Sequence, residues 1–119
     1  LGHLDLVKRY KAYEGNHDAF YHIIKEIFQI IIQDGRGIEV NTSGYRYGLE
    51  AAMPSMDILQ LYKEIGGEII TLGSDSHVET TLAFHFKETL EQLKDIGFKY
   101  ITTFENRQPI FHPIDQIEY

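Results

Sequence analysis

The sequence predicts an α/β fold in which parallel strands alternate with helices. Short apolar runs bounded by glycine are typical of buried strands, and 69–72 between Gly67 and Gly73 is the clearest of them. Longer segments with apolar residues at helical spacing separate these runs. Such alternation implies a parallel sheet with right-handed crossovers. Because a complete (β/α) barrel needs roughly 250 residues, the 119 residues predict one domain, 1–119, that is a partial barrel.

Each predicted element has its own local signal. The end of a strand running into a loop is expected at 1–6, and whole strands are expected at 38–41, 69–72 and 100–104. The first helix can be capped by Asn16, carries apolar residues at helical spacing from Phe20 to Ile31 and stops at 34–37, where glycines allow a turn. Two further helices are expected, one from 54 to the glycines at 66 and 67, and one from about 80 to Ile96. No motif marks the tail after residue 104.

Composition excludes several classes of protein. There are 11 basic and 18 acidic residues, a net charge of −7, which argues against a nucleic-acid-binding or anionic-membrane surface. Without cysteine, disulfides and thiolate zinc sites are absent. No apolar run approaches the roughly 20 residues of a membrane span. We therefore expect a cytoplasmic protein, or a piece of one.

The central strand ends in the polar sequence Gly73-Ser74-Asp75-Ser76-His77. If the chain stays extended there, Asp75 and His77 point to the same side. A carboxylate beside an imidazole at the carboxyl end of a strand suits Zn, Mn or Fe. The alternative is that Ser74 or Asp75 caps the next helix.

Polar residues also occupy the other strand tips. His3 and Asp5 follow the first strand, and Glu39 and Asn41 alternate onto one face of the second. In a barrel such tips converge on one mouth. Of the second pair, Asn41 is the better candidate for the mouth.

Three blocks and a dipeptide occur in an order that resembles a known family. They are Gly2-His3-Leu4-Asp5-Leu6-Val7-Lys8-Arg9-Tyr10, Glu39-Val40-Asn41-Thr42-Ser43-Gly44-Tyr45-Arg46, Pro54-Ser55 and Gly73-Ser74-Asp75-Ser76-His77. The set resembles the C-terminal half of a histidinol-phosphatase of the PHP (polymerase and histidinol phosphatase) family. The resemblance implies a distorted (β/α)7 barrel whose mouth holds up to three divalent metals (Zn, Mn or Fe) and hydrolyses phosphate esters.

The resemblance also implies roles for single residues. His3 matches a ligand of one metal of a close pair, Asp75 a ligand of the other, and His77 a ligand of a third, more separate metal. Arg46 is placed where it would bind the substrate phosphate and assist catalysis, since a guanidinium pairs two oxygens at once. Asn41 is the further candidate for substrate binding.

Two family motifs, a His-x-His and a segment with a bridging Glu, have no counterpart in the 119 residues. The three predicted metal ligands would each address a different metal, whereas a catalytic zinc normally keeps about three protein ligands. We therefore expect the chain by itself to bind metal poorly and to turn over little substrate.

The resemblance implies hydrolysis of L-histidinol phosphate, a small phosphate ester, to L-histidinol and phosphate in histidine biosynthesis. Two alternatives stay open at this stage. One is a nuclease-type or polymerase-associated PHP domain, against which the acidic charge counts. The other is a non-catalytic fragment or interaction module. The uncovered edges of a partial barrel predict exposed apolar surface, or self-association that hides it.

Overall fold

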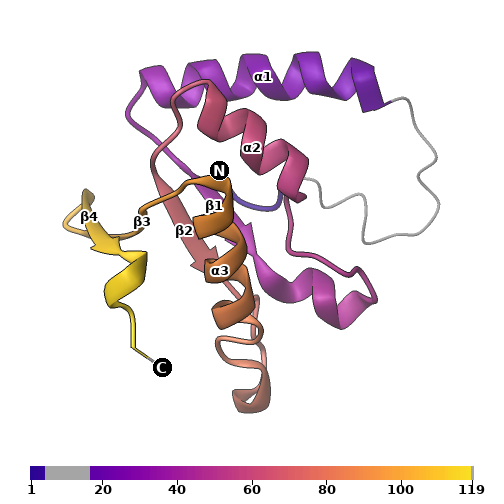
Figure 1. The fold of residues 1–119 in the computed structure, drawn as a ribbon, viewed down its shortest axis with the longest axis vertical. Coiled ribbons are helices and arrows are strands. Elements are labelled where there is room, and N and C mark those ends of the chain that lie inside the picture. Colours follow the sequence, from indigo (N-terminus) through magenta and orange to yellow (C-terminus); the bar gives the residue numbers. More distant parts are fainter. Residues whose placement is uncertain (5–16, 119) are drawn as a thin grey trace.

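A parallel pair of short strands lies at the centre of the computed structural model, which describes residues 1–4 and 17–118 (Figure 1). The two strands, β1 (Ile38–Asn41) and β2 (Ile70–Gly73), pair in parallel from Ile38 opposite Ile70 to Asn41 opposite Gly73. The first residue extends this arrangement on the other side of β1. The amino group of Leu1 donates to the carbonyl of Gly37 (2.8 Å), and the amide of Glu39 donates to the carbonyl of Leu1 (2.9 Å). The prediction of parallel strands at 38–41 and 69–72 is therefore confirmed.

Three helices accompany the strands, α1 (His17–Gln33), α2 (Met56–Glu64) and α3 (Phe86–Ile96). Their apolar faces share one core with β1 and β2, because inward residues recur every three or four positions along each helix. The core residues with no exposed surface are Phe28, Val40, Leu59, Tyr62, Ile70 and Leu93. Within this core the rings of Phe28 and Tyr62 meet edge to face, with 4.9 Å between their centroids.

The predicted end of the first helix is confirmed, and its mechanism is a glycine cap. Gly35 adopts a φ of 67°, which costs a residue without a Cβ nothing. The amides of Gly35 and Arg36 then donate back to the carbonyls of Ile32 and Ile31. Gly97, with a φ of 110°, ends α3 in the same way. The cap predicted for the start of the first helix lies outside the described residues.

The third helix begins six residues later than predicted. The residues expected to form its first turn instead form a 3₁₀ turn, Glu79–Thr81. Left-handed backbone follows at Ala83 and His85. Because an α-helix cannot pass through positive φ, α3 starts only at Phe86. Leu82, which the expected helix would have included, is 75% exposed.

The prediction that the strand at 100–104 joins the parallel sheet is wrong. β3 (Tyr100–Glu105) pairs antiparallel with β4 (Gln108–Pro113), a strand that the sequence analysis missed. Asn106 and Arg107 form the two-residue turn, both with positive φ, which matches the right-handed twist of a hairpin. β3 still passes alongside β2, so the hairpin extends the layer rather than forming a separate unit.

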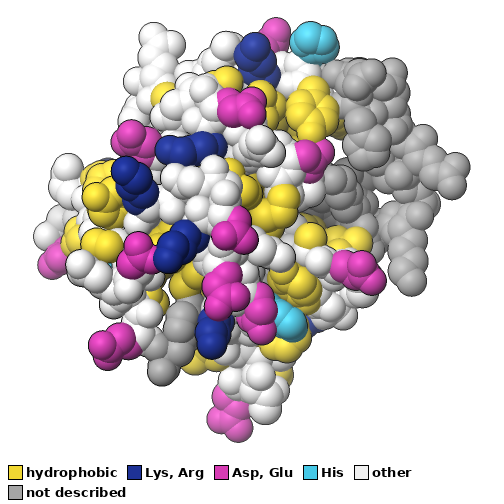
Figure 2. Space-filling view, viewed as in Figure 1, with side chains coloured by type: hydrophobic (Ala, Val, Ile, Leu, Met, Phe, Trp, Pro, Cys, Tyr) yellow, Lys and Arg dark blue, Asp and Glu magenta, His cyan; other side chains and the backbone are white. Residues whose placement is uncertain are grey.

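The structure confirms a mixed α/β fold with a parallel two-stranded sheet and helices. Apolar side chains reach the surface at several places, including the hairpin on the left of the view in Figure 2. Among the described residues, no helix has the length and apolar character needed to cross a membrane.

Candidate functional site

The candidate site lies at the carboxyl end of the parallel strands. Because Leu1 pairs alongside Ile38, His3 follows at the same end of the sheet at which β2 passes into the loop 74–77. His3 and Asp75 both have left-handed backbone, with φ of 53° and 49°. Asp tolerates this conformation better than most residues, because its short side chain hydrogen-bonds locally.

Arg46 ties the loop 74–77 to the segment that follows β1. That segment is a 3₁₀ helix, η2 (Thr42–Tyr47), which carries Arg46 in its last turn. The guanidinium donates to the carbonyl of Ser74 (2.6 Å) and to the carbonyl of Asp75 (2.9 Å). A guanidinium has five N–H groups, and each of the two terminal nitrogens used here carries a second one. Arg46 therefore positions the loop and keeps donors for an anion.

His77 folds back on the same carbonyl. Its Nδ1 lies 2.9 Å from the carbonyl oxygen of Asp75. Because a carbonyl only accepts, this hydrogen bond places the proton on Nδ1 and leaves the lone pair on Nε2. A neutral imidazole with its other nitrogen held by an oxygen is the usual state of a metal-binding histidine. The imidazole is exposed, so Nε2 is accessible.

The sequence predicts Asn41 rather than Glu39 as the functional residue at this end of the sheet, and the structure gives the two residues different roles. Asn41 is buried, and its Oδ1 accepts a hydrogen bond from the amide of Ser43 (2.9 Å), capping η2. The carboxylate of Glu39 instead lies against the glycines that precede the loop and His3. A Cβ on Gly73 would clash with Oε1 of Glu39, and one on Gly2 would meet Oε2 at 3.2 Å.

The glycines therefore make room for a carboxylate that the sequence analysis passed over. The available signal was the pair of glycines, one directly before His3 and one two residues before Asp75. These two glycines lie on the segments beside β1 and leave space between them for the long acidic side chain of Glu39.

The described residues do not bring together a closed metal shell. Among 1–4 and 17–118, no group of three or more His, Asp or Glu side chains lies close enough to hold one ion. The structure thus places the three predicted ligands in segments at one end of the sheet without gathering them around one point. Their metal-binding roles, and the roles of Arg46 and Asn41 toward a substrate, stay predictions.

Other residues near the loop are held by stacking. The ring of His85 lies 4.3 Å from the ring of Tyr45 at an interplanar angle of 13° and meets Phe84 edge to face. The hydroxyl of Tyr45 also reaches Gln92 of α3. These contacts join η2 to the start of α3, which gives a physical reason for the late beginning of that helix.

Taken together, the fold and site are those of a small α/β protein with acidic, imidazole and guanidinium groups at the carboxyl end of parallel strands. Curated proteins similar to the chain are histidinol-phosphatases by name. A probable histidinol-phosphatase of Thermotoga maritima is 31% identical over 104 residues, which make up 85% of this chain and 42% of that protein. One of Clostridium acetobutylicum is 31% identical over 110 residues, 90% of this chain and 42% of that protein.

A histidinol-phosphatase of Lactococcus lactis is 34% identical over 109 residues, 87% of this chain and 39% of that protein. No protein-family model matches the chain. The chain spans about two fifths of the length of these curated relatives, and the match falls in their C-terminal portions. The resemblance to the C-terminal half of the histidinol-phosphatases is therefore confirmed over nearly all of the chain.

Proposed function

We propose that the chain is the C-terminal portion of a cytoplasmic, metal-dependent phosphomonoesterase that hydrolyses L-histidinol phosphate to L-histidinol and phosphate in histidine biosynthesis. The observation that carries this proposal is the arrangement of Arg46, Asp75 and His77 around one carbonyl at the end of β2. It occurs in a chain similar to proteins named histidinol-phosphatase. The proposed architecture is a distorted (β/α)7 barrel of PHP type, of which the described elements are a part.

In this proposal His3, Asp75 and His77 each contribute to one of up to three divalent ions, Zn, Mn or Fe. The described residues alone do not form a complete ligand set, so the remaining ligands come from other parts of the protein. When bound, such ions supply an activated water and neutralise charge on the phosphoryl oxygens.

The chain's own contribution is positioning. Arg46 holds the backbone of the loop through two carbonyls and offers its remaining N–H groups to the phosphoryl oxygens. The hydrogen bond from Nδ1 of His77 orients the ring so that Nε2 is the ligating nitrogen. Glu39, lying between the segments of His3 and Asp75, adds negative charge that favours cations at this end of the sheet.

The alternatives have less support. A nuclease-type or polymerase-associated role requires contact with a polyanion, and the net charge of −7 opposes it. A non-catalytic interaction module, or self-association through exposed apolar residues, does not account for the polar cluster at one end of the parallel strands.

The test is a chimera in which the 119 residues replace the matching C-terminal portion of the Thermotoga maritima relative. We expect phosphate release from L-histidinol phosphate in the presence of Mn or Zn, and little release by the 119 residues alone. Thermal unfolding of the chimera checks that it folds. If the isolated chain matched the chimera in rate, the ligand assignment would be wrong.

Two substitutions in the chimera separate the proposed roles. Asp75→Asn keeps the size of the side chain but removes a charged ligand, so both the rate and the bound metal should fall, the rate by about 100-fold or more. Arg46→Ala should lower the rate by about 100-fold but lose less metal than Asp75→Asn, because it removes no proposed metal ligand and only loosens the loop that carries two of them. Asp34→Asn and Arg36→Ala are the matched controls, since both residues are exposed before the amino end of β1. If the chimera with Asp75→Asn kept its normal rate and metal content, the proposal that this loop binds metal would be wrong.

A further inference from the structure

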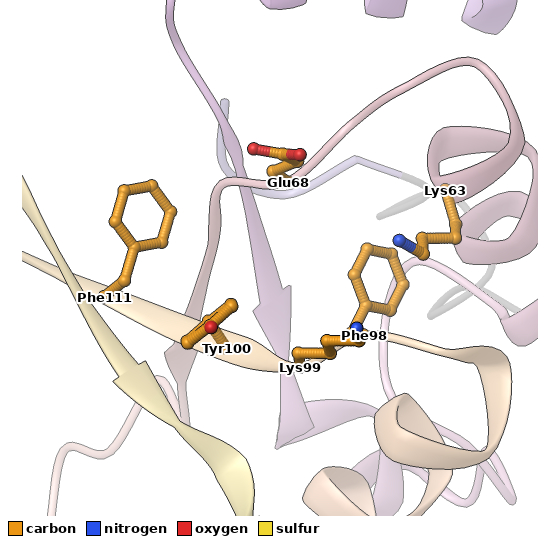
Figure 3. A pocket seen from close by; sticks show the side chains of 6 residues that line it. All are labelled: Lys63, Glu68, Phe98, Lys99, Tyr100 and Phe111. Atoms are coloured by element: carbon orange, nitrogen blue, oxygen red, sulfur yellow. The ribbon is translucent and has the colours of Figure 1, made fainter.

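A pocket of about 600 Å³ lies at the amino end of β2, opposite the candidate site. It is formed where the end of α2, the approach to β2 and the hairpin meet, and its lining residues are Lys63, Glu68, Phe98, Lys99, Tyr100 and Phe111 (Figure 3). Its volume lies in the range of pockets that bind small molecules. None of its residues takes part in the proposed phosphatase chemistry.

Aromatic rings form the walls of this pocket. Tyr100 and Phe111, on adjacent strands, meet edge to face with 6.0 Å between their ring centroids, and each is more than two fifths exposed. Figure 3 shows these two rings on one side of the pocket and Phe98 with Lys63 on the other. Exposed rings beside a hollow favour a planar ligand, because stacking on them removes apolar area from water.

The charged groups of the pocket point to an anion. Across the described part of the chain, neither Lys63 nor Lys99 forms an ion pair, although the protein as a whole is strongly acidic. The ammonium of Lys63 instead lies 5.6 Å from the centre of the Phe98 ring. An acidic group on a ligand would therefore find two unpaired cations beside the aromatic walls.

Glu68 adds a requirement of its own. Its carboxylate only accepts hydrogen bonds and repels a second anion, so the part of the ligand beside it must be a donor. In Figure 3 it lies between the two aromatic sides, away from the hairpin strands.

We propose that this pocket binds a small aromatic acid that carries a ring N–H or hydroxyl donor. The ring packs against Tyr100 and Phe111, the acid group pairs with Lys63 or Lys99, and the donor faces Glu68. The proposal does not depend on the phosphatase proposal, because the two sites lie at opposite ends of β2 and share no residue.

The test is a titration of the unmodified 119-residue chain, labelled with ¹⁵N, with three related compounds followed by amide chemical shifts. Indole-3-acetate has the ring, the acid and the N–H donor, and we expect saturable shifts at residues 98–100 and 111 with a Kd of about 1 mM or lower. Indole-3-acetamide lacks the charge and should bind about tenfold more weakly. 1-Naphthaleneacetate lacks the N–H donor and should bind several-fold more weakly.

Substitutions then assign the groups. Replacing both Lys63 and Lys99 with Met should weaken indole-3-acetate about tenfold while leaving indole-3-acetamide unchanged, and Lys25→Met on the exposed side of α1 should change neither. Glu68→Gln should remove the preference for the indole over the naphthalene. Equal binding of the acid and the amide, shifts that do not saturate, or shifts elsewhere on the chain would each overturn the proposal. Because the compound series uses the unmodified chain, this result does not depend on the folding of a variant.

Discussion

The two strand pairs of the molecule differ in how far their apolar side chains are buried. In the parallel pair, Ile38, Val40 and Ile70 are at most 1% exposed, because helices cover that face of both strands. In the hairpin, Tyr100 and Phe104 of β3 and Phe111 of β4 are 42–51% exposed. The stability of the described fold therefore resides in β1, β2 and their helices. The hairpin instead offers surface, either to a ligand or to another part of a larger protein.

The substitution Ile70→Ala tests the buried side of this comparison and should have the largest effect. Ile70 has no exposed surface, and its truncation leaves a cavity in the core that the strands share with the helices. We expect a loss of about 2–5 kcal/mol in the free energy of unfolding, measured by urea denaturation with circular dichroism. A loss below about 1 kcal/mol would show that the parallel pair does not anchor the core.

The pH dependence of stability in alkaline solution tests the burial of Tyr62 in the same core. Burial raises the pKa of its phenol to about 12, while its hydroxyl donates to the carbonyl of Ile69 (3.0 Å). The unfolded chain loses this proton near pH 10 and the folded chain only near pH 12, so stability is unaffected below pH 10 and falls as pH rises between them. The full loss is about 2–3 kcal/mol.

The measurement is the urea midpoint between pH 9 and pH 11, with Tyr62→Phe as the matched control. The control keeps the ring and removes the ionisable group, so its stability should fall less steeply over this range. Identical slopes for the two proteins would show that Tyr62 does not titrate differently on folding.

Arg46→Met tests whether the guanidinium holds the loop 74–77 of the candidate site in place. The change keeps an unbranched stem and removes two charge-assisted hydrogen bonds to the carbonyls of Ser74 and Asp75. We expect a loss of about 1–2 kcal/mol and faster amide hydrogen exchange in the loop 74–77. Unchanged exchange in that loop would mean that the guanidinium does not position it.

Phe104→Ala should have the smallest effect and completes the comparison with Ile70→Ala. Phe104 is 51% exposed on β3, so its truncation leaves no closed cavity. We expect a change of at most about 1 kcal/mol in the free energy of unfolding, measured under the same conditions. A loss as large as that of Ile70→Ala would contradict the view that the hairpin is peripheral to the core.

Local sequence determined those features that depend on nearest neighbours. The helical spacing between Phe20 and Ile31 and the glycine at position 35 set the end of α1 without help from distant residues. The apolar runs at 38–41 and 69–72 identified two buried strands, and their alternation with helices identified the parallel arrangement. The ordered polar blocks also identified the family resemblance that the comparisons confirm.

Features that depend on contacts between distant segments were decided only by the tertiary structure. β4 contains Pro109 and Pro113, which count against a strand in sequence, but an edge strand tolerates residues without an amide donor. α3 starts late because Ala83 and His85 have left-handed backbone, and His85 stacks on Tyr45, forty residues away in the chain. Local propensity contains neither fact, because both arise from pairing energies that exist only once the chain has folded.

The same division applies to the candidate site. The sequence alone predicted Arg46, Asp75 and His77 as functional residues, since their types and order carry the resemblance. It did not predict that they meet at the carbonyl of Asp75, or that Glu39 rather than Asn41 lies against the neighbouring glycines. Strand alternation places both residues of β1 on one face, and only the packing of the adjacent segments decides which side chain has room there.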